Sequence, residues 1–194
     1  MPTWKEIVEK NPQHSVQYAA RWRRFQAEGT DIDGEARMID AMAPRGARIL
    51  DAGCGTGRVG GYLAARGHRV TGTDVDDVLL EHARHDFPDV TWARVDLETE
   101  PQPEGPYDII VLAGNVVGFI DPAARGAMLR SLREVLADGG RCVIGYGAGR
   151  GWPFDDFLRD AQAAGFREDI LFSSWDLRPF TADSPFLVAV LRGD

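Results

Sequence analysis

The sequence predicts an α/β fold in which a largely parallel sheet is covered by helices on both faces. From residue 47 onward, short apolar runs alternate with amphipathic segments, as in right-handed βαβ units. The run IIVLAG at 109–114 is apolar throughout, which is typical of a central strand buried on both faces. The last two extended runs have no helix between them, so they must pair antiparallel.

Two helices are expected before this alternation begins. Aromatic side chains recur at helical spacing through residues 15–29. They are Tyr18, Trp22 and Phe25. Asp33 is suitably placed to cap a second helix, which Pro44 ends. We therefore expect a single domain, with residues 1–44 as an N-terminal helical cap and residues 45–194 as an α/β core.

The elements of the core follow in order along the chain. Short apolar runs predict strands at 47–52, 68–74, 90–96, 107–114 and 141–147. Amphipathic segments between them predict helices at 57–65, 77–87, 122–137 and 153–164. The third helix has the clearest signals, because Asp121 suits the N-cap, Pro122 suits the first turn and Gly139 follows the last turn. The closing antiparallel pair is expected at 168–177 and 184–192.

Composition and charge narrow the function classes. The chain has 194 residues, of which 44% are hydrophobic, enough for one well-buried core. Its formal net charge of -8 argues against binding to DNA, RNA or anionic lipid, which needs clusters of Lys and Arg. The sequence shows no apolar leader and no run long enough to span a membrane. We expect a soluble, cytoplasmic protein without a nucleic-acid or membrane partner.

The residue types that form metal sites are few and scattered. Cys54 and Cys142 are far apart and form no CxxC pair, so neither a disulfide nor a zinc site is expected. His82 and His85 are three residues apart, which places both on one helical face, but the sequence suggests no third ligand. We therefore expect no metal.

The turn after the first strand, DAGCGTGR at 51–58, points to a ligand. Its three glycines allow the backbone to turn sharply and approach a bound molecule, and the next helix directs its N–H groups there. The dinucleotide fingerprint is GxGxxG, whereas this spacing is GxGxG and Arg58 stands at the position of the third glycine. Asp51 would repel a pyrophosphate but attract a cationic amine. The turn therefore favours a ligand that has an amino-acid group and no phosphate.

Two more acids are expected at the same edge of the sheet. Asp74 ends the second strand, where its carboxylate can accept hydrogen bonds from both hydroxyls of a ribose. Asp96 follows the third strand, where its carboxylate can accept a hydrogen bond from an exocyclic amine, with Leu97 beside it. Because ligands of open parallel sheets bind beyond the carboxyl ends of the strands, these strand ends would hold an amino acid, a ribose and a base in turn.

Taken together, these motifs resemble the class I S-adenosylmethionine-dependent methyltransferases over nearly the whole chain. The segments that carry the resemblance are ILDAGCGTGR, TGTDVD, VDLE and YDIIVLAGNVVGF. The resemblance implies a Rossmann-like, doubly wound sheet of seven strands in the order 3-2-1-4-5-7-6, with the last strand antiparallel. Within the family, the chain is similar to compact bacterial small-molecule enzymes of the tellurite-resistance type.

The resemblance also implies S-adenosyl-L-methionine as the cofactor and assigns residues to its parts. The methionine end would lie among Asp51, Gly53, Gly55, the Ala113 carbonyl, Gly114 and Asn115. The adenosine end would lie among Asp74 at the ribose, Val75 on the adenine face, and Asp96 and Leu97 at the adenine edge. The aromatic N-terminal helix would cover the cofactor, with Tyr18, Arg21 or Arg23 reaching its carboxylate or an acidic substrate.

The expected reaction is in-line methyl transfer to a small molecule, catalysed mainly by proximity and desolvation. A general base is needed only where the acceptor must lose a proton. Asn115 and Tyr146 are the candidates for catalytic contact with the acceptor, and Trp152 is a further residue that would line its pocket. The identity of the acceptor and the oligomeric state stay open.

Two alternative functions also stay open. A catalytically silent protein that binds S-adenosylmethionine would share the fold and the motifs, because binding does not establish chemistry. A nicotinamide-dependent oxidoreductase uses a similar sheet, but the GxGxG spacing and Asp51 argue against it. The chain also has no room for a separate substrate domain.

Overall fold

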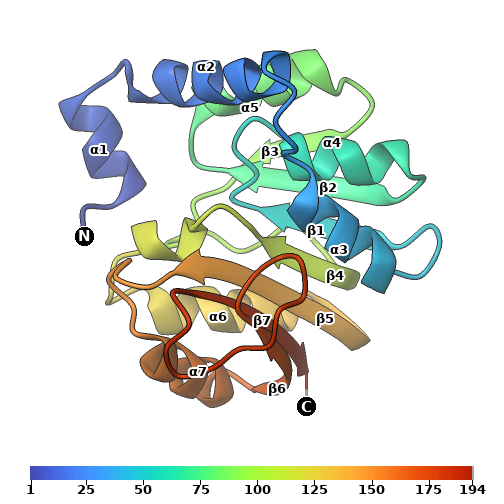
Figure 1. Ribbon diagram of the computed structural model, residues 1–194, viewed down its shortest axis with the longest axis vertical. Helices are drawn as coiled ribbons and strands as arrows, with labels where there is room; N and C mark the ends of the chain where they lie inside the picture. The colour runs from blue at the N-terminus through green and yellow to red at the C-terminus, as the bar shows by residue number, and fades with distance from the viewer. Residues whose placement is uncertain (194) are drawn as a thin grey trace.

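A computed structural model describes residues 1–193 and contains one seven-stranded sheet with helices on both sides (Figure 1). The strands are β1 (Arg48–Ala52), β2 (Arg69–Asp74), β3 (Thr91–Arg94), β4 (Tyr107–Leu112), β5 (Leu136–Gly147), β6 (Phe166–Phe172) and β7 (Phe186–Gly193). The helices are α1 (Trp4–Lys10), α2 (His14–Ala27), α3 (Gly34–Met42), α4 (Arg58–Ala65), α5 (Asp77–Asp86), α6 (Arg125–Glu134) and α7 (Phe154–Ala163), with the 3-10 helix η1 (Val116–Phe119) after β4. No helix among the described residues is both long and apolar enough to cross a membrane.

The strand order confirms the expected topology. The sheet runs β3-β2-β1-β4-β5-β7-β6, and β7 is antiparallel to both of its neighbours. In the parallel part, Asp51 of β1 lies in register with Gly72 of β2 and Val111 of β4. The carboxyl ends of β1, β2, β3 and β4 therefore meet at one edge, which is where the sequence predicts the ligand site.

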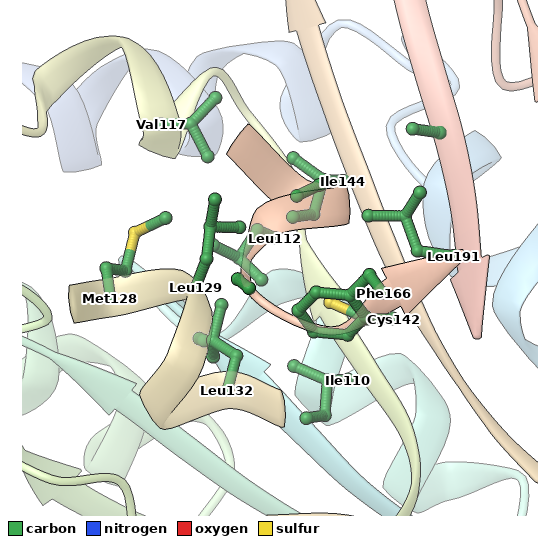
Figure 2. Close-up of a cluster of buried hydrophobic side chains, with 14 of the residues drawn as sticks. Ile110, Leu112, Val117, Met128, Leu129, Leu132, Cys142, Ile144, Phe166 and Leu191 are labelled. Carbon is green, nitrogen blue, oxygen red and sulfur yellow. The ribbon is translucent and has the colours of Figure 1, made fainter. Parts of the chain in front are cut away.

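The two faces of the sheet have separate cores. On one face α6, α7 and η1 cover a cluster that includes Leu112, Leu129 and Ile144, shown in Figure 2. On the other face α3 and α4 cover a second cluster, which includes Ile39 and Leu63. Burial on both faces explains the apolar β4 run, since its strand supplies side chains to both clusters.

The N-terminal segment 1–44 divides into two parts in the structure. The helix α3 belongs to the sheet core, because Ala36, Met38 and Ile39 are buried there. Only α1 and α2 lie outside the sheet layers, and α1 was not expected from the sequence. Asp33 occupies the N-cap position of α3 but makes no side-chain capping hydrogen bond, so that part of the expectation was wrong.

The helix predicted at 122–137 is shorter at both ends. Asp121 Oδ1 accepts a hydrogen bond from the Ala123 amide at 2.8 Å, and this turn precedes the first residue of α6. At the other end Leu136 pairs with Tyr107 as the first residue of β5. The sequence pattern missed this boundary because an apolar residue at the end of a helical stripe is equally suited to a buried strand.

Candidate active site

A cleft opens at the carboxyl edge of the sheet and encloses about 680 Å³ of space when its open mouth is included. Most residues expected to bind the cofactor line it, namely Tyr18, Gly53, Gly55, Asp74, Val75, Asp96, Leu97, Ala113 and Gly114, whereas Asp51 and Asn115 do not. The remaining wall includes the N-terminal residues Thr3, Trp4 and Lys5 and residues of η1. A smaller adjoining hollow is lined by Asp51 together with Tyr18, Gly53 and Gly114. The structure thus brings the predicted residues from four strand ends and one helix around a single space.

The glycine turn is shaped by backbone contacts with β2. The amides of Gly53 and Cys54 both donate to the Thr73 carbonyl, at 2.7 and 2.9 Å. Gly53 and Gly55 have φ angles of 76° and 56°, in the left-handed region that favours glycine. A Cβ on Gly53 would lie 2.6 Å from Val116 of η1, so the turn and η1 meet too closely for any side chain.

The third glycine of the turn has a packing role instead. A Cβ on Gly57 would lie 2.7 Å from the Trp92 ring, and one on Gly60 would lie 3.0 Å from it. A Cβ on Gly72 would overlap the same indole. Trp92, on β3, therefore occupies the space that these glycines leave and holds α4 close to the sheet. The sequence suggested ligand approach for Gly57, but Gly57 is not among the residues that line the cleft.

Asp51 is a buried carboxyl group without a cation. Its side chain accepts a hydrogen bond from the Gly60 amide at 2.9 Å, and within residues 1–193 it forms no ion pair. Burial raises the pKa of Asp51 to about 7, against the opposing effects of the Gly60 amide and of Arg58. Arg58 itself is bound by both carboxylate oxygens of Glu35, at 2.8 and 2.9 Å. A cationic ligand group at the glycine turn would supply the missing counter-charge.

Asp74 is held in place by the backbone around it. Its Oδ2 accepts a hydrogen bond from the Gly55 amide at 2.8 Å, and its Oδ1 accepts one from the Asp76 amide at 2.9 Å. Burial raises the pKa of Asp74 to about 6 in spite of these hydrogen bonds. Each carboxylate oxygen can accept a second hydrogen bond, so Asp74 combines a fixed position with free acceptor capacity toward the cleft.

Asp96 differs from the other two acids because a lysine neutralises it. Lys5 Nζ lies 2.8 Å from Asp96 Oδ2 and 2.6 Å from Glu98 Oε2. Burial opposes ionisation of Asp96, but the hydrogen bonds from Lys5 and from the Glu98 amide prevail and keep its pKa below the usual range. The carboxylates of Asp96 and Glu98 in turn raise the pKa of Lys5, first through its hydrogen bond with Asp96. The acid expected at the adenine edge is thus ionised and already shared with α1.

The N-terminal helices are attached to the site through Asp76, which the sequence analysis missed. Asp76 Oδ2 accepts hydrogen bonds from Trp4 Nε1, at 2.8 Å, and from the Ser15 hydroxyl. Its Oδ1 caps α5 by accepting from the amides of Val78 and Leu79. The DVD spacing at 74–76 was a signal that a second acid follows the ribose acid, but its partners lie more than 60 residues away in the sequence.

Aromatic side chains complete the wall on the N-terminal side. Trp4 contacts the rings of Tyr18 and Phe119 edge to face, each at a centroid distance of 5.4 Å. A Cβ on Gly55 would lie 3.5 Å from the Tyr18 ring, which places Tyr18 over the glycine turn. The Arg21 guanidinium stacks on the outer side of this cluster, 4.8 Å from the Tyr18 centroid. Arg23 instead contacts His82, so Tyr18 is the member of the expected trio that lines the cleft.

The two candidates for catalytic contact lie outside the cleft lining. Asn115 Oδ1 accepts a hydrogen bond from the Gly147 amide at 2.8 Å and so ties η1 to the end of β5. Tyr146 is fully buried against Phe154 and Phe157, and burial raises its pKa. Trp152 is buried as well, with its indole donating to Asp160 at 3.1 Å. These contacts are structural and lend no support to a catalytic role.

His82, His85 and Cys54 have separate surroundings in the structure. Within the described part of the chain, no group of three or more His, Cys, Asp or Glu side chains is arranged to hold a metal ion. The two histidines of α5 have different partners, since His82 contacts Arg23 and His85 contacts Asp86. Burial raises the pKa of Cys54 well above its usual range, so this residue is a thiol rather than a nucleophilic thiolate.

The chain is similar to known methyltransferases in both sequence and structure. Residues 49–140 match the family model described as "Methyltransferase domain". A crystal structure of a TehB-like SAM-dependent methyltransferase from Corynebacterium glutamicum is 53% identical, with a TM-score of 0.93, and covers 95% of this chain and 100% of that one. SAM-bound CalS10, an amino pentose methyltransferase from Micromonospora echinaspora, shares the fold with a TM-score of 0.71 at 20% identity, over 90% of this chain and 96% of that chain.

Curated relatives are more distant, and the matches cover only part of each protein. Demethylmenaquinone methyltransferase from Tropheryma whipplei is 31% identical over 134 residues, which are 64% of this chain and 47% of that protein. In general the chain spans about half the length, or less, of the curated relatives that it matches. The likeness to the Corynebacterium structure, by contrast, extends over both chains almost from end to end.

Proposed function

Because this chain belongs to the class I S-adenosylmethionine-dependent methyltransferases, we propose that it transfers the methyl group of S-adenosylmethionine to a small-molecule acceptor. The observation that carries this proposal is Asp51, a fully buried carboxyl group whose pKa is about 7 and which has no cationic partner among the described residues. Burying such a group is costly unless something ionic is bound beside it. The ammonium group of the cofactor has the required charge.

The other residues of the cleft fit the same ligand. Asp74 would bind the ribose hydroxyls, since its oxygens are oriented by two backbone amides and keep lone pairs free. Val75 and Leu97 would pack on the adenine, and Asp96 would accept a hydrogen bond from its amine. Gly53, Gly55 and the Ala113 carbonyl would surround the methionine end. No cluster of arginines or lysines lines the cleft, which is consistent with a ligand that carries no phosphate.

The chain's own contribution to the reaction is to hold and enclose the reactants. S-adenosylmethionine supplies an activated methyl group together with its leaving group. Tyr18, Trp4 and Phe119 form an aromatic wall on one side of the cleft, which would exclude water from the bound reactants. Correct positioning of two reactants alone lowers a barrier by roughly 7–11 kcal/mol. The acidic net charge of -8 favours a small acceptor over a nucleic acid.

Ligand binding and product formation test the two parts of this proposal. The midpoint of thermal unfolding should rise with S-adenosylmethionine and with its demethylated product, because both bind the native state, and should not rise with NAD or NADP. Incubation with a metabolite extract and labelled cofactor should then yield a methylated small molecule. A rise with NAD alone would refute the proposed cofactor. Binding without any labelled product would instead identify a silent cofactor-binding protein.

Cofactor affinity should depend on pH in a direction that Asp51 determines. The ammonium of the ligand pairs with an ionised carboxylate, and a group with a pKa of about 7 is half ionised at pH 7. At pH 5 only about one molecule in a hundred is ionised, so affinity should fall by roughly 50-fold between pH 7 and pH 5. Asp74, with a pKa of about 6, acts in the same direction. Calorimetric titration at pH 5, 6, 7 and 8 measures this, and a constant affinity would contradict it.

A further inference from the structure

The helix α1, together with Tyr18 of α2, forms the part of the cleft wall that is not built on the sheet. The glycine turn, the strand ends and η1 are all continuous with buried strands. The helix α1, by contrast, has seven residues and buries none of them, although Trp4 and Lys5 line the cleft. Figure 1 shows it at the margin of the molecule, joined to the rest through α2. A wall with so little buried surface is the one whose opening costs least.

Two carboxylates hold this helix at the adenine end. Lys5 Nζ contacts Asp96 and Glu98 at 2.8 and 2.6 Å, and the Lys5 side chain is 45% exposed while those of the two acids are 13% and 9% exposed. Both acids are themselves fixed by the backbone, since Asp96 Oδ1 accepts from the Glu98 amide and Glu98 Oε1 accepts from the Asp121 amide. Asp96 and Glu98 therefore form a fixed site for one ammonium group, and Lys5 is the partner that can move away from it.

We propose that Lys5 is a positioning residue that holds α1 closed over the adenine end of the cleft and so sets the dissociation rate of the cofactor. This rests on the proposed function, because it takes S-adenosylmethionine as the occupant. Lys5 acts through Asp96, the acid assigned to the adenine amine, so one ion pair both orients that acid and fixes the covering helix. The bond from Trp4 to Asp76 is a second attachment, so loss of Lys5 loosens α1 without freeing it.

The kinetics of cofactor release test this role. Lys5→Met keeps most of the apolar stem and removes the charge, and it should raise the dissociation rate of S-adenosylmethionine by roughly three- to tenfold. Lys5→Arg should restore most of the slow release. Lys10→Met, at an exposed position on the same helix, is the matched control and should release cofactor like the natural protein. KM for the cofactor should rise in Lys5→Met with little change in kcat.

Salt provides a signature that a merely structural role would not produce. Raising NaCl should speed cofactor release from the natural protein, because screening weakens a partly exposed ion pair, and should have little effect on Lys5→Met. Equal release rates and equal salt dependence in the two proteins would overturn the proposal. Amide exchange in residues 4–10 is the readout that needs no cofactor, and it should be faster in Lys5→Met than in Lys10→Met. If the natural protein bound no S-adenosylmethionine, the proposed function would fail, whereas unchanged exchange would reject the role of Lys5 alone.

Discussion

Replacing Asp51 by Asn is expected to weaken cofactor binding by roughly thirtyfold or more, while stabilising the protein without ligand at pH 8. The first effect follows because truncating one partner of a buried, hydrogen-bonded charge pair typically costs about 2–5 kcal/mol. The amide keeps an oxygen that can accept from the Gly60 amide, so the glycine turn should retain its shape. Calorimetry with S-adenosylmethionine measures the loss of affinity, and an unchanged dissociation constant would refute the proposed role of Asp51.

The second effect follows from the raised pKa of Asp51. Its value is about 7 in the folded protein against 3.8 for an ordinary aspartate. Below pH 3.8 the carboxyl is protonated in both states; as the pH rises toward 7, the unfolded chain ionises first and the free energy of unfolding falls. The full penalty, on the order of 4 kcal/mol at most, is present above pH 7.

The gain in stability of Asp51→Asn should therefore be larger at pH 8 than at pH 5. Urea unfolding at both pH values measures this difference. Asp89→Asn, which removes the same charge from an exposed turn, is the matched control and should change stability little at either pH. A gain that did not depend on pH would show that Asp51 titrates normally in the folded protein.

Replacing Gly53 by Ala is expected to destabilise the protein by about 3 kcal/mol or more and to remove most cofactor binding. Two effects combine, because Gly53 has a φ of 76° and its new methyl group would lie 2.6 Å from Val116. Since both the turn and η1 line the cleft, any movement that relieves this clash displaces a cofactor-contacting wall. Urea unfolding and a cofactor titration measure the two consequences.

Gly46→Ala separates the backbone cost from the steric clash. Gly46 has a φ of 70°, yet a Cβ there would meet nothing within 4 Å. It should lose only the roughly 1–2 kcal/mol of a left-handed alanine and bind cofactor normally. Adding Val116→Ala to Gly53→Ala should recover part of the stability, since it removes the methyl groups that clash. If the two substitutions lowered the free energy of unfolding equally, the close approach of η1 to Gly53 would contribute nothing to the loss of stability.

The main strand ends of the site were predictable from local pattern. The β1 and β2 strands are largely buried, whereas β3 is a short edge strand with both end residues exposed. Asp51, Asp74 and Asp96 stand at or just after the ends of these three strands. Because parallel strands share one carboxyl edge, position along the chain translates directly into proximity in space. The cleft lining confirms that these segments meet, and the assignment of each residue to a part of the cofactor stays a prediction.

The contacts that close the cleft were not predictable in this way. Trp4 and Asp76 are 72 residues apart and Lys5 and Asp96 are 91 apart, and no periodicity links them. A seven-residue helix with no buried side chain leaves almost no apolar pattern to detect. Likewise, the glycines at 57, 60 and 72 are understood only once Trp92 is seen to occupy the space beside them.

By itself, the sequence determined the alternation of strands and helices, the glycine turn and the acids that follow three strands. These depend on interactions within a few residues and on the rule that parallel strands end together. Tertiary structure alone decided which acids carry a counter-charge: Lys5 reaches Asp96, while Asp51 is buried with none among residues 1–193. That difference depends on burial and on partners distant in sequence. It distinguishes Asp96, which binds α1 through Lys5, from Asp51, whose proposed partner is a ligand.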